Sequence, residues 1–250
     1  MKAMLFAAGL GTRLRPLTDD RPKALVEVAG RPLLDHVMQR LAEAGCDELV
    51  VNVHHYGNKV IDFLNSHSCY GMTVHVSDER EMLLDTGGGI IKARRWLDGN
   101  EPFIVHNADI LSTLDLRAMV DAHRASGATA TLLVKERNTQ RYLLFDDDNR
   151  LRGWTNITTG ELRPAGLIVD AQWRQRAFGG IHVLSPAIFD TLEQYNRHEG
   201  PKFGITSFYI DSCRQLDIRG YEPSGEYQWL DVGKLETLAL AEKMMNEHLL

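Results

Sequence analysis

Leu5-Phe6-Ala7-Ala8-Gly9-Leu10-Gly11-Thr12-Arg13 joins an apolar strand to a glycine-rich turn that is followed at once by a cation. Glycines let backbone amides approach an anion closely, and the amino terminus of a following helix would add favourable partial charge. Arg15 comes two residues later, and Lys23 lies one short loop further on. This composition predicts a phosphate-binding loop after a first strand at Lys2–Ala7.

Working outward from this loop, the first half of the chain alternates short apolar strands with amphipathic helices. After Lys2–Ala7, the predicted strands are Leu49–Val53, Thr73–Val76, Phe103–Val105 and Thr129–Val134, and the predicted helices are Pro32–Ala44, Asn58–Ser66, Ile90–Trp96 and Leu116–Ala125. Four strand–helix units in succession predict an α/β fold with a doubly wound, mostly parallel sheet.

The rhythm changes after Val134. Tyr142–Phe145 and Leu151–Trp154 flank a polar turn with three aspartates, which predicts a β-hairpin. Further predicted elements are the strands Phe178–Leu184, Leu216–Gly220 and Trp229–Val232 and the helices Pro186–Tyr195, Ile205–Arg214 and Leu235–Leu249. We expect one domain over residues 1-250, with a smaller β-rich subregion at 135-225. The sequence contains no internal repeat. In particular, it lacks the hexapeptide period of a β-helix near its end, so we expect no C-terminal β-helix.

Composition excludes several classes of function. The formal net charge of −6 gives no basic surface for nucleic acid. The three cysteines are spaced too widely for a disulfide framework or a zinc motif, which favours a reducing compartment. No apolar run approaches the ~18 residues that a membrane helix needs. We therefore expect a cytoplasmic protein with neither nucleic-acid nor membrane partners.

Two named nucleotide-binding motifs do not fit the glycine loop. A Walker A loop ends in Gly-Lys-Ser/Thr, whereas Gly11 is followed by Thr12 and Arg13. A dinucleotide fingerprint has a third Gly or Ala where this chain has Leu14, which disfavours a nicotinamide oxidoreductase. His54 and His55 have no third ligand at metal-binding spacing, so we assign them structural or solvent-facing roles.

The run from Gly9 to Thr18, followed by Arg21-Pro22-Lys23-Ala24-Leu25 and Gly30-Arg31-Pro32-Leu33, resembles the signature of the sugar-1-phosphate nucleotidyltransferases. Leu84–Ile90 is similar to the loop with which that family contacts the base. Asn107-Ala108-Asp109 and Trp229-Leu230-Asp231-Val232-Gly233 resemble its two metal motifs. The resemblance spans residues 5 to 233 and is strongest to the N-acetylmuramate-1-phosphate uridylyltransferase branch.

The resemblance implies a Rossmann-like fold with a nucleotide-binding half at 1-134, a sugar-binding subregion at 135-225 and a closing segment at 226-250. It also implies that the nucleoside triphosphate is bound by Ala8, Gly9, Gly11, Thr12, Arg13, Lys23, Gly87 and Gly88, of which Arg13 and Lys23 would be catalytic. The sugar 1-phosphate would be contacted by Asn107 and Arg141. Mg²⁺ would be held by Asp109 and Asp231. Arg137, Arg141 and Tyr142 precede the hairpin in the same subregion, which makes them candidates to bind the phosphate or the carboxylate of the acceptor.

The chain departs from the family pattern in two places. Lys234 stands where Thr is frequent, and no Glu-Lys-Pro segment precedes the second metal motif. The lysine that usually binds the sugar phosphate therefore has no counterpart in its usual place.

The implied reaction is in-line attack of a sugar-1-phosphate oxygen on the α-phosphorus, which needs charge neutralisation and no enzyme nucleophile. Asp109 follows an apolar strand, so it should lie at the same sheet edge as the Gly9 loop. UTP is slightly favoured. A GTP-dependent mannose- or heptose-1-phosphate guanylyltransferase, a phosphocholine cytidylyltransferase and a non-catalytic nucleotide-binding regulator stay open, as do a monomer and a homodimer.

Overall fold

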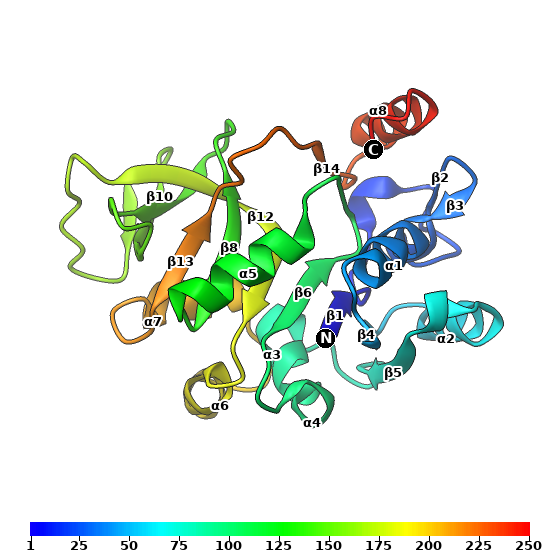
Figure 1. The fold of residues 1–250 in the computed structure, drawn as a ribbon, viewed down its shortest axis with the longest axis horizontal. Helices are drawn as coiled ribbons and strands as arrows, with labels where there is room; N and C mark the ends of the chain where they lie inside the picture. Colours follow the sequence, from blue (N-terminus) through cyan, green and yellow to red (C-terminus); the bar gives the residue numbers. More distant parts are fainter.

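A computed structural model describes residues 1–250, and four parallel strands form one side of its ten-stranded sheet (Figure 1). They are β1 (Lys2–Phe6), β4 (Glu48–Val53), β5 (Thr73–Asp78) and β6 (Phe103–Asn107), in the order β6-β1-β4-β5. Phe6 pairs with Asn107, so β1 and β6 end side by side. The chain after each strand therefore leaves the sheet at the same edge, as the sequence predicted.

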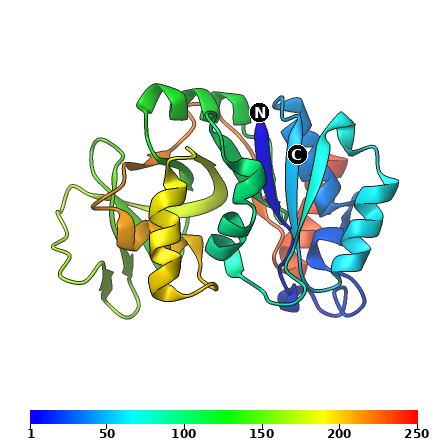
Figure 2. The ribbon, with the colours of Figure 1, turned by 90° about the horizontal axis from the view of Figure 1, so that it is seen from below.

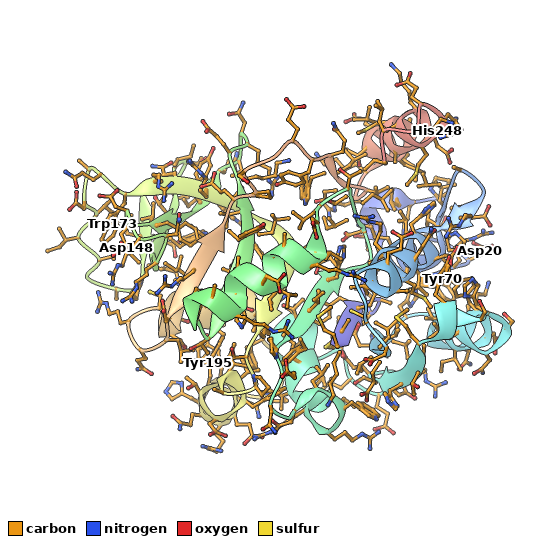
Figure 3. All side chains as sticks on the ribbon, viewed as in Figure 1. Asp20, Tyr70, Asp148, Trp173, Tyr195 and His248 are labelled. Carbon is orange, nitrogen blue, oxygen red and sulfur yellow. The ribbon has the colours of Figure 1, made fainter.

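The other side of the sheet is mostly antiparallel. The long strand β12 (Arg174–Leu184) pairs antiparallel with β6, β8 (Ala130–Lys135) and β9 (Arg141–Phe145), and the sheet continues through β10 (Leu151–Asn156) and β11 (Glu161–Arg163). β13 (Ile218–Tyr221) pairs parallel with β8. The predicted hairpin is confirmed as β9–β10. Its polar turn projects at the end of the molecule, where Asp148 and Trp173 lie opposite Asp20 and Tyr70 (Figure 3).

Two short ribbons and the helices complete the chain. The ribbons are β2 (Glu27–Val28) with β3 (Arg31–Pro32), and β7 (Ile110–Ser112) with β14 (Trp229–Asp231). The helices are α1 (Leu33–Glu43), α2 (Gly57–Ser66), α3 (Asp85–Lys92), α4 (Arg94–Leu97), α5 (Leu116–Ser126), α6 (Ile188–Glu199), α7 (Ile205–Ser212) and α8 (Leu235–Asn246), with 3-10 turns η1 (Thr12–Leu14), η2 (Lys23–Leu25) and η3 (Cys69–Gly71). None combines the length and apolar character that crossing a membrane requires.

Helices cover both faces of the sheet (Figure 2). Successive side chains of β1 point to opposite faces, as the pleat requires. Ala3 and Leu5 join a core with α1, α2, α5 and α8, whereas Met4 joins a second core with α3, α4, α6 and α7. This doubly wound, three-layer arrangement confirms the predicted fold class, and no β-helix follows it.

One predicted element differs. We expected a loop at Gly87–Gly89 with a helix from Ile90, but α3 begins at Asp85 and buries all three glycines. A Cβ on Gly87 would lie 2.2 Å from the Phe203 ring, and one on Gly88 would lie 2.1 Å from the carbonyl oxygen of Pro201. Glycine is a poor helix former, so close tertiary packing overrides its intrinsic propensity here.

Candidate active site

A cavity of about 380 Å³ opens where the parallel strands end. Its wall includes five residues that the sequence assigned to the site: Ala8, Gly9, Lys23, Asn107 and Asp109. These residues come from the loop after β1, from η2 and from the end of β6. The carboxyl edge of the parallel strands thus gathers them, as expected for an open α/β sheet.

The glycine loop packs against Lys23 at Gly11. Gly11 has a φ of +65°, and a Cβ at this position would lie 3.0 Å from both the Lys23 Cβ and the Thr18 Cγ2. The Thr18 hydroxyl donates a 2.9 Å hydrogen bond to the Gly11 carbonyl oxygen. Both the left-handed backbone and the close approach therefore require glycine at position 11.

The segment after the loop is shorter than the pattern suggested. Only the single 3-10 turn η1 follows Gly11, and its Leu14 is fully buried. No long helix starts after the glycine loop, so the favourable partial charge of a helix amino terminus, which the sequence suggested, is not available there. Positive charge near the cavity comes from side chains instead.

Lys23 and Asp109 form an ion pair inside the cavity wall. Asp231 reaches the same place from far along the chain, because β14 pairs with β7 directly after Asp109. The Val232 amide donates a 2.8 Å hydrogen bond to the Asp109 carbonyl oxygen. The two aspartates predicted as metal ligands are therefore neighbours in the fold.

The Asp231 carboxylate lacks a complete set of partners. Its Oδ1 atom is buried without a hydrogen bond. Burial raises the pKa of Asp231, the negative charge of Asp109 raises it further, and Lys23 and Arg13 act in the opposite direction. A buried, unsatisfied carboxylate oxygen beside a second carboxylate is an unfavourable arrangement unless a cation binds there.

Arg13 lies beside this pair. A Cβ on Gly233 would be 2.7 Å from Asp231 Oδ1 and 2.9 Å from Arg13 Nη2. Both side chains therefore pass over the bare backbone of Gly233, which explains the glycine that ends the second metal motif.

These groups fit a hard divalent cation. The chain supplies the carboxylates of Asp109 and Asp231, and no cluster of three or more His, Cys, Asp or Glu side chains surrounds them. Mg²⁺ typically takes one or two protein carboxylates and completes its shell with water and phosphate oxygens. The donor set therefore matches Mg²⁺ bound together with a nucleotide.

Seven other residues that the sequence assigned to the site do not line the cavity: Gly11, Thr12, Arg13, Gly87, Gly88, Arg141 and Asp231. Thr12 is exposed in η1, while Gly87 and Gly88 are buried inside α3. Arg141 is exposed at the start of β9, and its backbone amide bonds to Thr139. Asn107, by contrast, lines the cavity. Its side-chain amide packs on the backbone of Gly180, where an added Cβ would lie 2.8 Å from the Asn107 Nδ2 atom.

A buried polar network that the sequence did not reveal links the glycine loop to α3. The Asn52 side chain accepts a hydrogen bond from the Ala7 amide and donates one to Glu79, at 2.8 Å each. The other Glu79 oxygen accepts a 3.1 Å hydrogen bond from the Leu84 amide. Burial raises the pKa of Glu79, which is fully enclosed. The only signal in the sequence was a lone polar residue, Asn52, inside an apolar strand.

A second unpredicted feature is the strap, Pro201–Ile205, between α6 and α7. The Gly87 amide donates to the Phe203 carbonyl oxygen at 2.9 Å, and the Ile205 amide donates to the Thr86 hydroxyl at 2.9 Å. These contacts fix the backbone on both sides of Lys202, whose side chain lines the cavity together with Thr86. The strap therefore brings a third cation to the site from the antiparallel half.

Comparisons with known proteins agree with this geometry. Residues 2–248 match the family model described as nucleotidyl transferase. The chain is 48% identical to N-acetylmuramate alpha-1-phosphate uridylyltransferase from Caulobacter vibrioides, covering 98% of this chain and 97% of the relative. It is 32% identical to the enzyme of that name from Neisseria meningitidis serogroup B, covering 98% of each.

Solved structures share the fold at lower identity. A UDP-glucose pyrophosphorylase complexed with UDP-glucose superimposes with a TM-score of 0.76 at 18% identity, over 99% of this chain and 98% of that one. A putative glucose-1-phosphate thymidylyltransferase from Bacillus anthracis gives a TM-score of 0.80 at 18% identity, over 98% and 94%. With the family model matching nearly its whole length, the chain belongs to the nucleotidyl transferase family.

Proposed function

We propose that this enzyme transfers the uridylyl group of UTP to N-acetylmuramate 1-phosphate with Mg²⁺, releasing pyrophosphate. The two relatives that match the chain over nearly their full lengths carry this activity in their names. The observation that supports nucleotidyl transfer most strongly is the clustering of Lys23, Arg13, Asp109 and Asp231, of which Lys23 and Asp109 line the cavity.

In the proposed reaction, an oxygen of the acceptor phosphate forms a bond to the α-phosphorus of UTP. The bond from the α-phosphorus to the bridging oxygen breaks, and pyrophosphate leaves with that electron pair. No bond to the enzyme forms, so the side chains act by positioning and by charge. Negative charge develops on the oxygens of the transferring and leaving groups, where preorganised cations are most effective.

Each cation and carboxylate then has a distinct role. Arg13 offers a planar fork to phosphate oxygens, and Lys23 offers a point charge. Asp109 and Asp231 would hold Mg²⁺, which would supply charge neutralisation at the triphosphate. In the free enzyme, Lys23 forms an ion pair with Asp109, which keeps both charges compensated. When substrate binds, phosphate oxygens would replace Asp109 as the partner of Lys23, and Mg²⁺ would replace Lys23 as the partner of Asp109.

Lys202 is our candidate for the cation that meets the acceptor phosphate. It lines the same cavity as Lys23 and Asn107, and no carboxylate of the chain pairs with it. It would take the role for which the sequence has no Glu-Lys-Pro lysine. We further propose that residues 135-225 form the sugar-binding subregion. The three buried, unpaired cysteines support a reducing location such as the cytoplasm.

A substrate panel tests this function. UTP, GTP and CTP are each combined with N-acetylmuramate 1-phosphate, N-acetylglucosamine 1-phosphate, glucose 1-phosphate, mannose 1-phosphate and phosphocholine, and pyrophosphate release is measured. We expect the highest kcat/KM for UTP with N-acetylmuramate 1-phosphate, and loss of turnover when EDTA removes the metal. Highest turnover with another pair would reassign the substrates. No turnover by folded protein with any pair would refute the reaction class.

A further inference from the structure

Two cations outside the phosphate site lie on one aromatic side chain. Lys135 is the last residue of β8, and its ammonium lies 4.5 Å from the ring centroid of Trp229. The Arg137 guanidinium lies 5.3 Å from the same centroid. The Lys135 ammonium also lies 5.7 Å from the ring of Tyr227. We call Lys135 and Arg137, held on the Trp229 ring, the basic pair.

No carboxylate of the chain forms an ion pair with either member of the basic pair. Neither cation has an acidic side chain within ion-pair distance, and the nearby Glu222 pairs with Arg174 and Arg176 instead. Lys135 is half-buried, and both this burial and the positive charge of Arg137 lower its pKa. Arg137 is exposed, so the half-buried Lys135 is the cation that gains most from an anion bound beside it.

The basic pair borders the proposed reaction centre. Trp229 begins the three-residue strand β14 that ends with Asp231. Its indole nitrogen donates a 2.8 Å hydrogen bond to the carbonyl oxygen of Gly179, next to the Gly180 backbone that packs on Asn107. Trp229 is therefore fixed beside Asn107, and the basic pair on its ring lies close enough to the reaction centre for the charge of Arg137 to lower the pKa of Asp231. Lys135 and Arg137 belong to the antiparallel half, which the proposed function assigns to the acceptor.

We propose that Lys135 and Arg137 bind a carboxylate carried by the acceptor, so that the enzyme selects a sugar 1-phosphate that has a second, carboxylate charge. This inference rests on the proposed function and names the chemistry that distinguishes its acceptor. Lys23 and Lys202 already line the cavity where phosphate groups would lie, and Arg13 lies beside Asp231, which leaves the basic pair for a different anion. The planar guanidinium of Arg137 suits bidentate recognition of a carboxylate.

Two acceptors that differ in the carboxylate test this assignment. N-acetylmuramate 1-phosphate carries a lactyl carboxylate, and N-acetylglucosamine 1-phosphate lacks it. For Lys135→Met and Arg137→Gln, we expect KM for the carboxylate-bearing acceptor to rise about tenfold or more, the loss typical of a charged hydrogen bond. KM for UTP should stay within about twofold. Lys135→Arg, which keeps the charge, should recover most of the affinity.

The controls separate the possible outcomes. Lys243→Met removes an exposed cation on α8 and reports any effect of net charge alone. Melting temperatures show whether each variant is folded. Equal losses with both acceptors would overturn the proposal, because the pair would then bind the 1-phosphate. An unchanged KM for the carboxylate-bearing acceptor would overturn it as well. Absence of turnover in the wild type would instead refute the proposed function.

Discussion

The parallel and antiparallel halves of the sheet build the site in different ways. In the parallel half, β1 and β6 end at one edge, so the glycine loop and Asp109 meet as a direct result of topology. In the antiparallel half, neighbouring strands point in opposite directions. Its contributions reach the site through the end of β8, an irregular register in β12 and the strap between α6 and α7.

On the proposed function, this difference would separate the residues of the chemical step from those that recognise the acceptor. Backbone pairing and the Asn52–Glu79 network hold the charged groups of the parallel half in place. The antiparallel half supplies Lys202 from the strap, and Lys135 and Arg137 from the segment where β8 ends. Loops that extend from a rigid scaffold tolerate sequence change, so the acceptor can vary while the nucleotidyl transfer is kept. Variants in the first half should therefore alter turnover with every acceptor, and variants in the second should alter acceptor choice.

The largest expected effect is that of Asp109→Asn, in the parallel half. It removes negative charge at the proposed metal site, so kcat should fall by at least about 10²-fold with every acceptor. Steady-state rates at saturating Mg²⁺ measure the loss, and thermal unfolding should show a much smaller change. Asp121→Asn, on the exposed surface of α5, is the matched control. Rates like those of the wild type would refute the metal assignment.

Lys23→Ala should have the next largest effect. The variant removes the point charge assigned to the triphosphate and leaves Asp109 without its partner. KM for UTP should rise about tenfold, kcat should fall, or both, irrespective of the acceptor. Initial rates with varied UTP test this. Arg21→Ala changes an exposed cation two residues away that pairs with Asp20, and should behave like the wild type. Unchanged kinetics for Lys23→Ala would assign the lysine a structural role.

Gly87→Ala should weaken the connection between the halves. The new methyl would enter the space of the Phe203 ring, and overpacking of this kind costs about 1–3 kcal/mol. Urea unfolding should show that loss. KM should rise for both substrates, because the strap carries Lys202 and packs on the start of α3. Gly225→Ala is the control, since no atom lies within 4 Å of the position that its new methyl would take. An unchanged free energy of unfolding for Gly87→Ala would show that Phe203 and the strap move aside to accommodate the methyl group at little cost.

The smallest effect concerns two buried histidines at the junction of the halves. Burial lowers the pKa of His182 in β12 to about 3, with a contribution from His106, and burial lowers that of His106 in β6 to about 4. The unfolded chain has ordinary pKa values near ~6.5, so it binds more protons below that pH. The free energy of unfolding should be highest above pH 6.5 and should decline as the pH falls toward 4.

Urea unfolding between pH 7 and 5 measures this decline. His182→Leu should be less stable overall, because Tyr209 loses its 2.5 Å hydrogen-bond partner, and should show a shallower pH dependence. The exposed His198 provides the control, and His198→Asn should keep the slope of the wild type. A pH-independent free energy of unfolding in the wild type would mean that these imidazoles become protonated without unfolding the sheet.

The sequence by itself determined the elements whose signals are local. Apolar periodicity located the main strands and helices to within a few residues, except for α3, and the parallel order of the first half followed from repeated strand–helix units. Motif residues at strand ends, such as Gly9 and Asp109, could be placed at one edge because parallel strands share a direction. Asp231 was assigned from its motif. The pairing of β14 with β7 in the structure then brings it next to Asp109.

Tertiary structure alone decided the features that depend on distant contacts. Gly87–Gly89 form a helix because Phe203 and Pro201 occupy the space beside them, and no local pattern encodes that neighbour. Lys202 reaches the cavity through the same strap, and Lys135 meets Trp229 only where β8 and β14 come together. Propensity and periodicity describe a residue's nearest chain neighbours, whereas these contacts join segments roughly a hundred residues apart, whose packing appears only when the sheet is assembled.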